Sequence, residues 1–152
     1  MNLLPFRRYQ FSSKLSSINL LEKLDSNIEL YQGLRFDNYN FSTKLFVGKL
    51  RDNSFKIRPI LRGRNSFIPI IQGKLINRQS TTSIILKMRI NYFVSAFFIW
   101  ISITLIFFES HKNLSNILFA IFIYIIVIYL FNIECNKAIK SLQNIFEIYP
   151  EY

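Results

Sequence analysis

The chain has 152 residues, of which 51% are hydrophobic and 16% aromatic, and its 19 Lys and Arg against 9 Asp and Glu give a formal net charge of +10. The apolar content excludes a disordered basic tail, and a single cysteine and a single histidine exclude an intrachain disulfide and a common zinc site. The charge is concentrated in residues 1–89, which hold 16 of the 19 basic residues and five acidic ones.

Residues 1–89 are expected to form an α+β domain, a small antiparallel sheet with one flanking helix. The helix is predicted over residues 19–29, where Asn19 and Glu22 resemble a capping box. Pro59 and Pro69 indicate sheet edges or bulges, because proline cannot donate to a ladder. We expect about four to six strands. Runs rich in β-branched and aromatic residues place them at residues 7–15, 44–50, 54–61, 65–76 and 81–90.

Basic residues in the predicted strands come in pairs separated by two positions. A separation of two places both members of a pair on the same side of a strand, and apolar residues alternate with the first pairs. We therefore predict a sheet with one apolar face and one basic face that contacts anions or lipid. The pairs are Lys49 with Arg51, Lys56 with Arg58, Arg62 with Arg64, and Lys87 with Arg89.

Three kinds of partner fit a basic face at this stage. It can contact anionic lipid head groups, bind a small phosphate-bearing ligand, or bind an acidic protein or nucleic acid. Sequence-specific recognition of nucleic acid is not expected, because no RRM signature, zinc-finger spacing or helix-turn-helix is present. The four glycines are scattered and form no phosphate-binding loop.

The next segment, residues 90–133, is predicted to be a transmembrane hairpin. Two stretches without charge, about 90–108 and 114–132, approach the length that a helix needs to cross a bilayer core. Basic residues precede the first span and follow the second, which by the positive-inside rule places both termini in the cytoplasm. The membrane is then a bacterial inner membrane or an organellar membrane.

Small and weakly polar side chains line one face of each predicted span. Neither span contains an ionisable residue of the kind that proton and ion pathways often use, so packing between the two helices explains these faces better than a pore within one chain. A pore or homo-oligomer built from several copies stays open, and Trp100 in mid-span is a candidate for contact between chains. The proposed helix-contact residues are Asn91, Ser95, Trp100, Ser102, Ala120 and Tyr124.

Residues 134–152 are predicted to form an amphipathic cytoplasmic helix that ends before Pro150. Cys135 falls on its apolar stripe, which indicates a buried thiol rather than a reactive or lipidated one. No catalytic residues, cofactor or metal site are predicted. His111 is alone in the predicted hairpin loop, and nothing in the sequence brings Asp37 and Asp52 together.

Several segments resemble a group of small uncharacterised bacterial membrane proteins. The resemblance rests on FVGKLRDNSFKIRPILRGRNSFIPIIQGKL, TSIILKMRINYFV and ECNKAIKSLQNIF, and it covers about residues 45–147. It implies a β-rich domain, a two-span hairpin and a closing helix, with no known activity. The stretch RQSTTS stands where that group has a glycine-containing turn. In architecture alone the chain is similar to antiphage effectors that join two spans to a small β-barrel, although their spans come first.

Two functional hypotheses follow from these observations. In the first, the protein is a non-enzymatic membrane effector or sensor whose basic domain binds an anionic ligand or a lipid surface, and copies assemble to disturb the bilayer. In the second, it is a structural or assembly subunit of a larger membrane complex whose basic domain binds an acidic protein partner.

Overall fold

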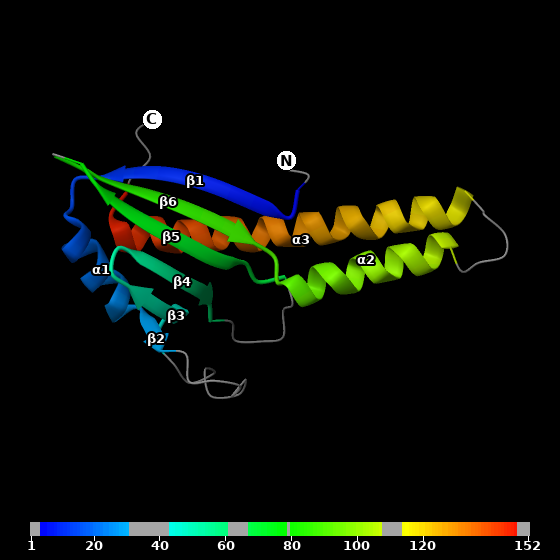
Figure 1. Cartoon of the computed structure of the whole chain (residues 1–152), viewed down its shortest axis with the longest axis horizontal. Coiled ribbons are helices and arrows are strands. Elements are labelled where there is room, and N and C mark those ends of the chain that lie inside the picture. The colour runs from blue at the N-terminus through cyan, green and yellow to red at the C-terminus, as the bar shows by residue number, and fades with distance from the viewer. Residues whose placement is uncertain (1–3, 31–42, 61–66, 79, 108–113, 149–152) are drawn as a thin grey trace.

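The computed structural model describes residues 4–30, 43–60, 67–78, 80–107 and 114–148. They form the predicted α+β fold, with a six-stranded sheet and three helices (Figure 1). The helices are α1 (Ser17–Ser26), α2 (Tyr92–Phe107) and α3 (Leu114–Phe146). The strands are β1 (Phe6–Ser13), β2 (Ile28–Leu30), β3 (Phe46–Arg51), β4 (Ser54–Pro59), β5 (Ile70–Asn77) and β6 (Thr82–Arg89).

The strand order is β1-β6-β5-β4-β3-β2, so the first two strands occupy opposite edges of the sheet. Strands β2 and β3 pair in parallel, and all the other neighbouring strands pair antiparallel. The expectation of a purely antiparallel sheet was therefore wrong. A parallel pair needs a crossover connection of about a dozen residues or more. Residues 31–45, which join β2 to β3, supply that length.

Helix α1 carries the chain from one edge of the sheet to the other. Its N-cap is Ser16, whose Oγ accepts a hydrogen bond from the backbone N–H of Asn19 at 3.2 Å. The predicted start at Asn19 was therefore wrong, because a serine three residues earlier already satisfies an open donor. Leu20 and Leu24 are fully buried against the sheet, as the apolar face of the predicted helix required.

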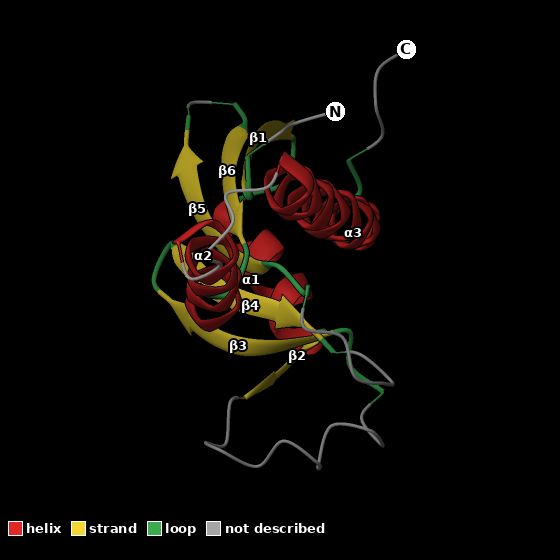
Figure 2. Ribbon diagram, turned by 90° about the vertical axis from the view of Figure 1, so that its right-hand side faces the viewer, coloured by secondary structure: helices red, strands yellow, loops and turns green. Residues whose placement is uncertain are grey.

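Helices α1 and the C-terminal half of α3 cover one face of the sheet and enclose the core (Figures 1 and 2). Alternate residues of the strands point into this core, which is typical of a sheet with one covered face. The sheet contributes to the core Phe46, Phe55, Ile57, Ile71, Leu75, Ile84, Leu86 and Met88. Helix α3 contributes Phe131, Cys135, Ala138, Leu142 and Phe146.

Helix α3 is continuous over 33 residues, from the predicted second span to the C-terminal stripe. The separate amphipathic helix predicted after residue 133 is therefore the second half of one element. The sequence changes from apolar to partly polar at Asn132 and Glu134, but polar residues do not end a helix. No Gly or Pro lies between Leu114 and Phe146 to break it. Cys135 is fully buried on the apolar stripe, as predicted.

The end of α3 comes before Pro150 and is fixed by a left-handed residue. Glu147 has φ 53°, and the N–H of Ile148 donates to the carbonyl of Gln143 at 3.0 Å, which is a Schellman arrangement. The Glu147 carboxylate also forms an ion pair with Lys23 of α1. The two helices that cover the sheet are thereby joined at this end of the molecule.

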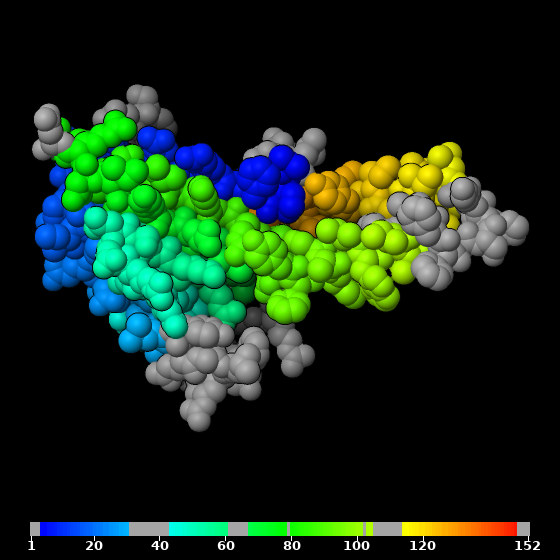
Figure 3. Space-filling model, viewed as in Figure 1, coloured from blue at the N-terminus to red at the C-terminus, as the bar shows by residue number. Residues whose placement is uncertain are grey.

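Helix α2 and the first half of α3 project together from the sheet domain (Figures 1 and 3). Large apolar side chains are exposed around both, for example Phe93 at 85% and Trp100 at 61%. Within the described residues, α3 is the one helix long and apolar enough to cross a membrane, by length and composition alone, and α2 is shorter. The six strands, α1 and the C-terminal half of α3 lie at the same end of this helix pair (Figure 1).

Candidate functional site: the basic face of the sheet

None of the described helices covers the second face of the sheet, which turns toward the viewer in Figures 1 and 3; we call it the open face. Because strand side chains alternate, residues between the buried positions occupy it. Ile84, Leu86 and Met88 are buried in β6, so Ile85, Lys87 and Arg89 lie on the open face.

A row of basic residues crosses five strands of the open face. Arg8 of β1 pairs with Lys87 of β6, and Lys87 pairs with Gln72 of β5. Gln72 pairs with Lys56 of β4, which pairs in turn with Lys49 of β3. Four cations and one amide therefore form a line perpendicular to the strands, which we call the middle row.

Two further rows flank the middle row. Farther from α2, the register places Arg51 opposite Ser54 and Lys74 opposite Ile85. Nearer α2, Arg89 lies between Phe6 and Ile70, and Arg58 lies opposite Val47. The near row is thus cationic and apolar, and the middle row is cationic and polar. The far row combines cationic and polar residues with Ile85.

The charges on the open face are strongly unbalanced. Within the described strands the register places eight basic residues and one acidic residue, Glu29 of the edge strand β2, on this face. Like charges directly opposite each other in a sheet are destabilising. Lys49 with Lys56, and Arg8 with Lys87, are two such pairs. The open face therefore carries a field that attracts anions.

The open face is hollowed at β3, β4 and β5. One hollow has a volume of about 450 Å³ and lies between Val47, Arg58 and Ile70, and a second of about 400 Å³ reaches Arg51, Gln72 and Gly73. Both hollows are also lined by Lys49 and Lys56. Their size is that of small-molecule sites, about 300–1,000 Å³.

Three of the four predicted basic pairs are brought together on this face. Lys49 with Arg51 and Lys56 with Arg58 line the hollows, and Lys87 with Arg89 lies two strands away. The fourth pair, Arg62 with Arg64, lies outside the described residues.

Sequence reasoning missed Arg8, Lys74 and Gln72 as members of this surface. Arg8 and Lys74 have no basic residue two positions away on their own strands, Gln72 is uncharged, and each joins the surface through pairing with neighbouring strands. Polar and charged residues alternating with apolar ones in β1 were the available signal for Arg8.

The proposed helix-contact residues are only partly brought together. Ser95 and Tyr124 line a largely apolar cavity of about 290 Å³ between α2 and α3, and Ala120 is buried. Asn91 instead caps α2, because its Oδ1 accepts from the N–H of Phe93 at 3.1 Å. Trp100 is exposed, as a residue available to lipid or another chain would be, and the side chain of residue 102 lies outside the described set.

Cys135 is a buried thiol of low reactivity. Burial raises the pKa of the Cys135 thiol from 9.0 to about 12, while the nearby Arg7 lowers that pKa and Glu134 raises it by smaller amounts. A thiol with this pKa is almost fully protonated at neutral pH and is a poor nucleophile. Among the residues that the structure describes, no three His, Cys, Asp or Glu side chains gather in a cluster that could hold a metal ion.

Comparisons with known protein families, with curated proteins and with solved structures find no match to this chain.

Proposed function

We propose that this is an integral membrane protein whose α2 and α3 cross the bilayer as a two-span hairpin. Residues 114–133 of α3 span about 30 Å at 1.5 Å per residue, which equals the thickness of the hydrocarbon core. Exposed apolar side chains surround the projecting pair, and soluble monomers rarely expose so large an apolar surface. The excess of basic residues in the sheet domain favours a cytoplasmic position for it and for both termini.

We propose further that the open face binds a small phosphate-bearing ligand in water. This proposal rests mainly on Lys49 and Lys56, which lie directly opposite each other and line both hollows. Repulsion between their charges lowers the stability of the fold when no anion lies between them. A phosphate group supplies several acceptor oxygens and neutralises this repulsion. Val47 and Ile70 add an apolar wall to one hollow, which suits a ligand with an apolar part such as a nucleotide base.

A lipid surface fits the two hollows less well than a soluble ligand does. The strands run along the length of the molecule in the same general direction as α3 (Figure 1). Successive rows of the open face therefore step away from the bilayer by about 6.8 Å, twice the rise of an antiparallel strand. Head groups reach the near row, but Lys49, Lys56 and Arg51 extend into water beyond it.

The ligand site is connected to the membrane helices through the core. Gly73 and Phe55 lie at the floor of the second hollow, and the Phe55 ring points to the covered face, where it is buried in the core. The Phe55 ring packs there against Phe146 near the end of α3, with ring centroids 6.2 Å apart. A ligand in the hollow is thus separated from α3 by the sheet backbone and one layer of core side chains, which supports a role as a ligand-sensing effector.

Ligand binding can be tested by heat denaturation of the purified protein in detergent. A panel of nucleotides, cyclic nucleotides and inorganic polyphosphate should contain at least one compound that raises the melting temperature at micromolar concentration. The double variant Lys49→Gln with Lys56→Gln should lose this shift, whereas Lys140→Gln on the exposed side of α3 should keep it. A flat response of the wild-type protein to the whole panel would refute the sensing proposal.

The assembly-subunit hypothesis makes a different prediction about the middle row. This row spans about 19 Å at 4.8 Å per strand, which is long enough for an acidic protein segment. Purification in mild detergent should then retain an acidic partner in fixed stoichiometry. Loss of that partner in the double variant, together with a flat ligand panel, would favour assembly over sensing.

A further inference from the structure

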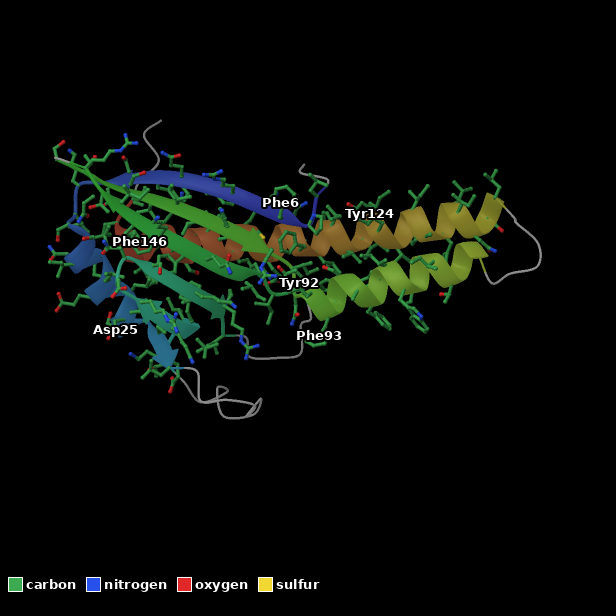
Figure 4. The ribbon with its side chains drawn as sticks, viewed as in Figure 1. Phe6, Asp25, Tyr92, Phe93, Tyr124 and Phe146 are labelled. Carbon is green, nitrogen blue, oxygen red and sulfur yellow. The ribbon has the colours of Figure 1, made fainter. Side chains whose placement is uncertain are left out.

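Arg89 occupies the point where the sheet domain meets the projecting helices. It is the last residue of β6, and α2 begins three residues later. On the open face it lies between Phe6 of β1 and Ile70 of β5. Figure 4 shows Phe6 and Tyr92 on either side of this junction, at the base of the helix pair. Arg89 therefore has apolar and aromatic neighbours at the level where the chain would enter a bilayer.

The guanidinium of Arg89 is oriented but incompletely hydrogen-bonded. Its central carbon lies 3.8 Å from the centroid of the Tyr92 ring, which is a close cation–π contact. Its Nη1 is buried and has no hydrogen-bond partner among the residues that the structure describes. A charged donor that is buried without an acceptor costs free energy, and a phosphate oxygen that reached this guanidinium would offset that cost.

We propose that Arg89, held by Tyr92, binds a phosphate group at the membrane boundary, and that this phosphate is the phosphodiester of a lipid head group. Phosphate oxygens match the planar fork of a guanidinium. The exposed rings of Phe6 and Tyr92 would lie beside the glycerol and upper acyl region, where aromatic residues are enriched.

This assignment rests on membrane insertion of α2 and α3, but it is separate from ligand binding in the hollows. Arg89 lines neither hollow. Insertion itself can be measured independently, because Trp100 is the single tryptophan of the chain. Quenching of its fluorescence by lipids that carry a nitroxide near mid-chain shows whether α2 is in the bilayer before the lipid site is tested.

The lipid site can be tested with short-chain lipids added to the delipidated protein in detergent. Phosphatidylglycerol should raise the melting temperature and should be retained in native mass spectra, whereas diacylglycerol with the same chains should not. Arg89→Gln should raise the half-saturating lipid concentration about ten- to a hundred-fold, the effect expected from loss of a charged hydrogen bond. Arg89→Lys keeps the charge and should still lose most of the affinity, because it lacks the fork and the planar stacking.

Lys140→Gln, on the exposed side of α3 and outside both hollows, is the matched control and should bind the lipid as the wild-type protein does. Equal lipid stabilisation in Arg89→Gln, Arg89→Lys and the wild-type protein would overturn the proposal. Stabilisation by inorganic phosphate alone, lost in Arg89→Gln, would overturn the lipid as the source of the phosphate. If Trp100 is quenched but phosphatidylglycerol has no effect, the lipid site is refuted while membrane insertion stands.

Discussion

Replacing Lys49 by glutamate should stabilise the folded protein while weakening its affinity for anions. Lys49 and Lys56 are directly opposite on β3 and β4, so the substitution converts a repulsive cross-strand pair into an attractive one. Each such pair is worth about 0.2–1 kcal/mol, repulsive or attractive, so the free energy of unfolding should rise by about 0.4–2 kcal/mol. For the sheet domain this corresponds to a rise in melting temperature of about 2–16 °C, at about 4–8 °C per kcal/mol.

The assay is heat denaturation in detergent at low and high ionic strength. Salt should stabilise the wild-type protein more than Lys49→Glu, because a Debye length near 3 Å at 1 M screens the Lys49–Lys56 repulsion. Lys140→Glu changes the net charge by the same amount on an exposed part of α3 and should give no stabilisation. If Lys49→Glu is no more stable than the wild-type protein, repulsion between Lys49 and Lys56 does not destabilise the fold as we infer.

Three other predictions test the core and the membrane segment. Gly73→Ala should lower the free energy of unfolding by about 1–3 kcal/mol in chemical denaturation, because a Cβ there would lie 2.0 Å from the Phe55 ring. A free energy of unfolding equal to that of the wild-type protein would show that the ring can move aside. Cys135 should react with maleimide at pH 8 only on unfolding, and rapid labelling of the folded protein would contradict its burial. The pKa of this thiol in the folded protein, about 12, exceeds its ordinary value of 9.0, so the free energy of unfolding should fall as the pH rises through that interval. In lipid vesicles the Trp100 emission should shift to shorter wavelength than in a water-soluble reference peptide, and an emission maximum typical of water would argue against insertion of α2.

The strands could be predicted from local patterns, but their neighbours could not. Alternation in residues 54–59 and 82–89 is a property of each segment, and the structure confirms strands at both. Which residue of one strand faces which residue of another depends on the order β1-β6-β5-β4-β3-β2, which no single segment encodes. Pairs such as Lys87 with Arg89 were therefore visible in the sequence, whereas the alignment of Arg8 with Lys87 was not.

Two of the errors in the predicted fold have distinct physical causes. The parallel strand β2 has three residues, too few for a periodic signal, and its pairing depends on a contact with β3 distant in sequence. The division of α3 at residue 133 treated a change from apolar to polar composition as a helix end. The absence of Gly and Pro from Leu114 to Phe146 was the better signal, since a helix with no breaker can leave one environment and enter another.

The continuity of α3 has a consequence for any signal between the open face and the bilayer. A single helix of 33 residues has no hinge at which motion can be absorbed, so displacement of its buried end moves its exposed end as well. The buried end is held by Phe146 against Phe55 and by the ion pair of Glu147 with Lys23. Phe55 lies on the core side of the sheet behind the second hollow, so an anion bound there would act through the sheet on the part of the core that fixes α3. Gly73→Ala should therefore change the response of the helices to ligand as well as stability, whereas loss of packing at Leu20, on α1, should change stability alone.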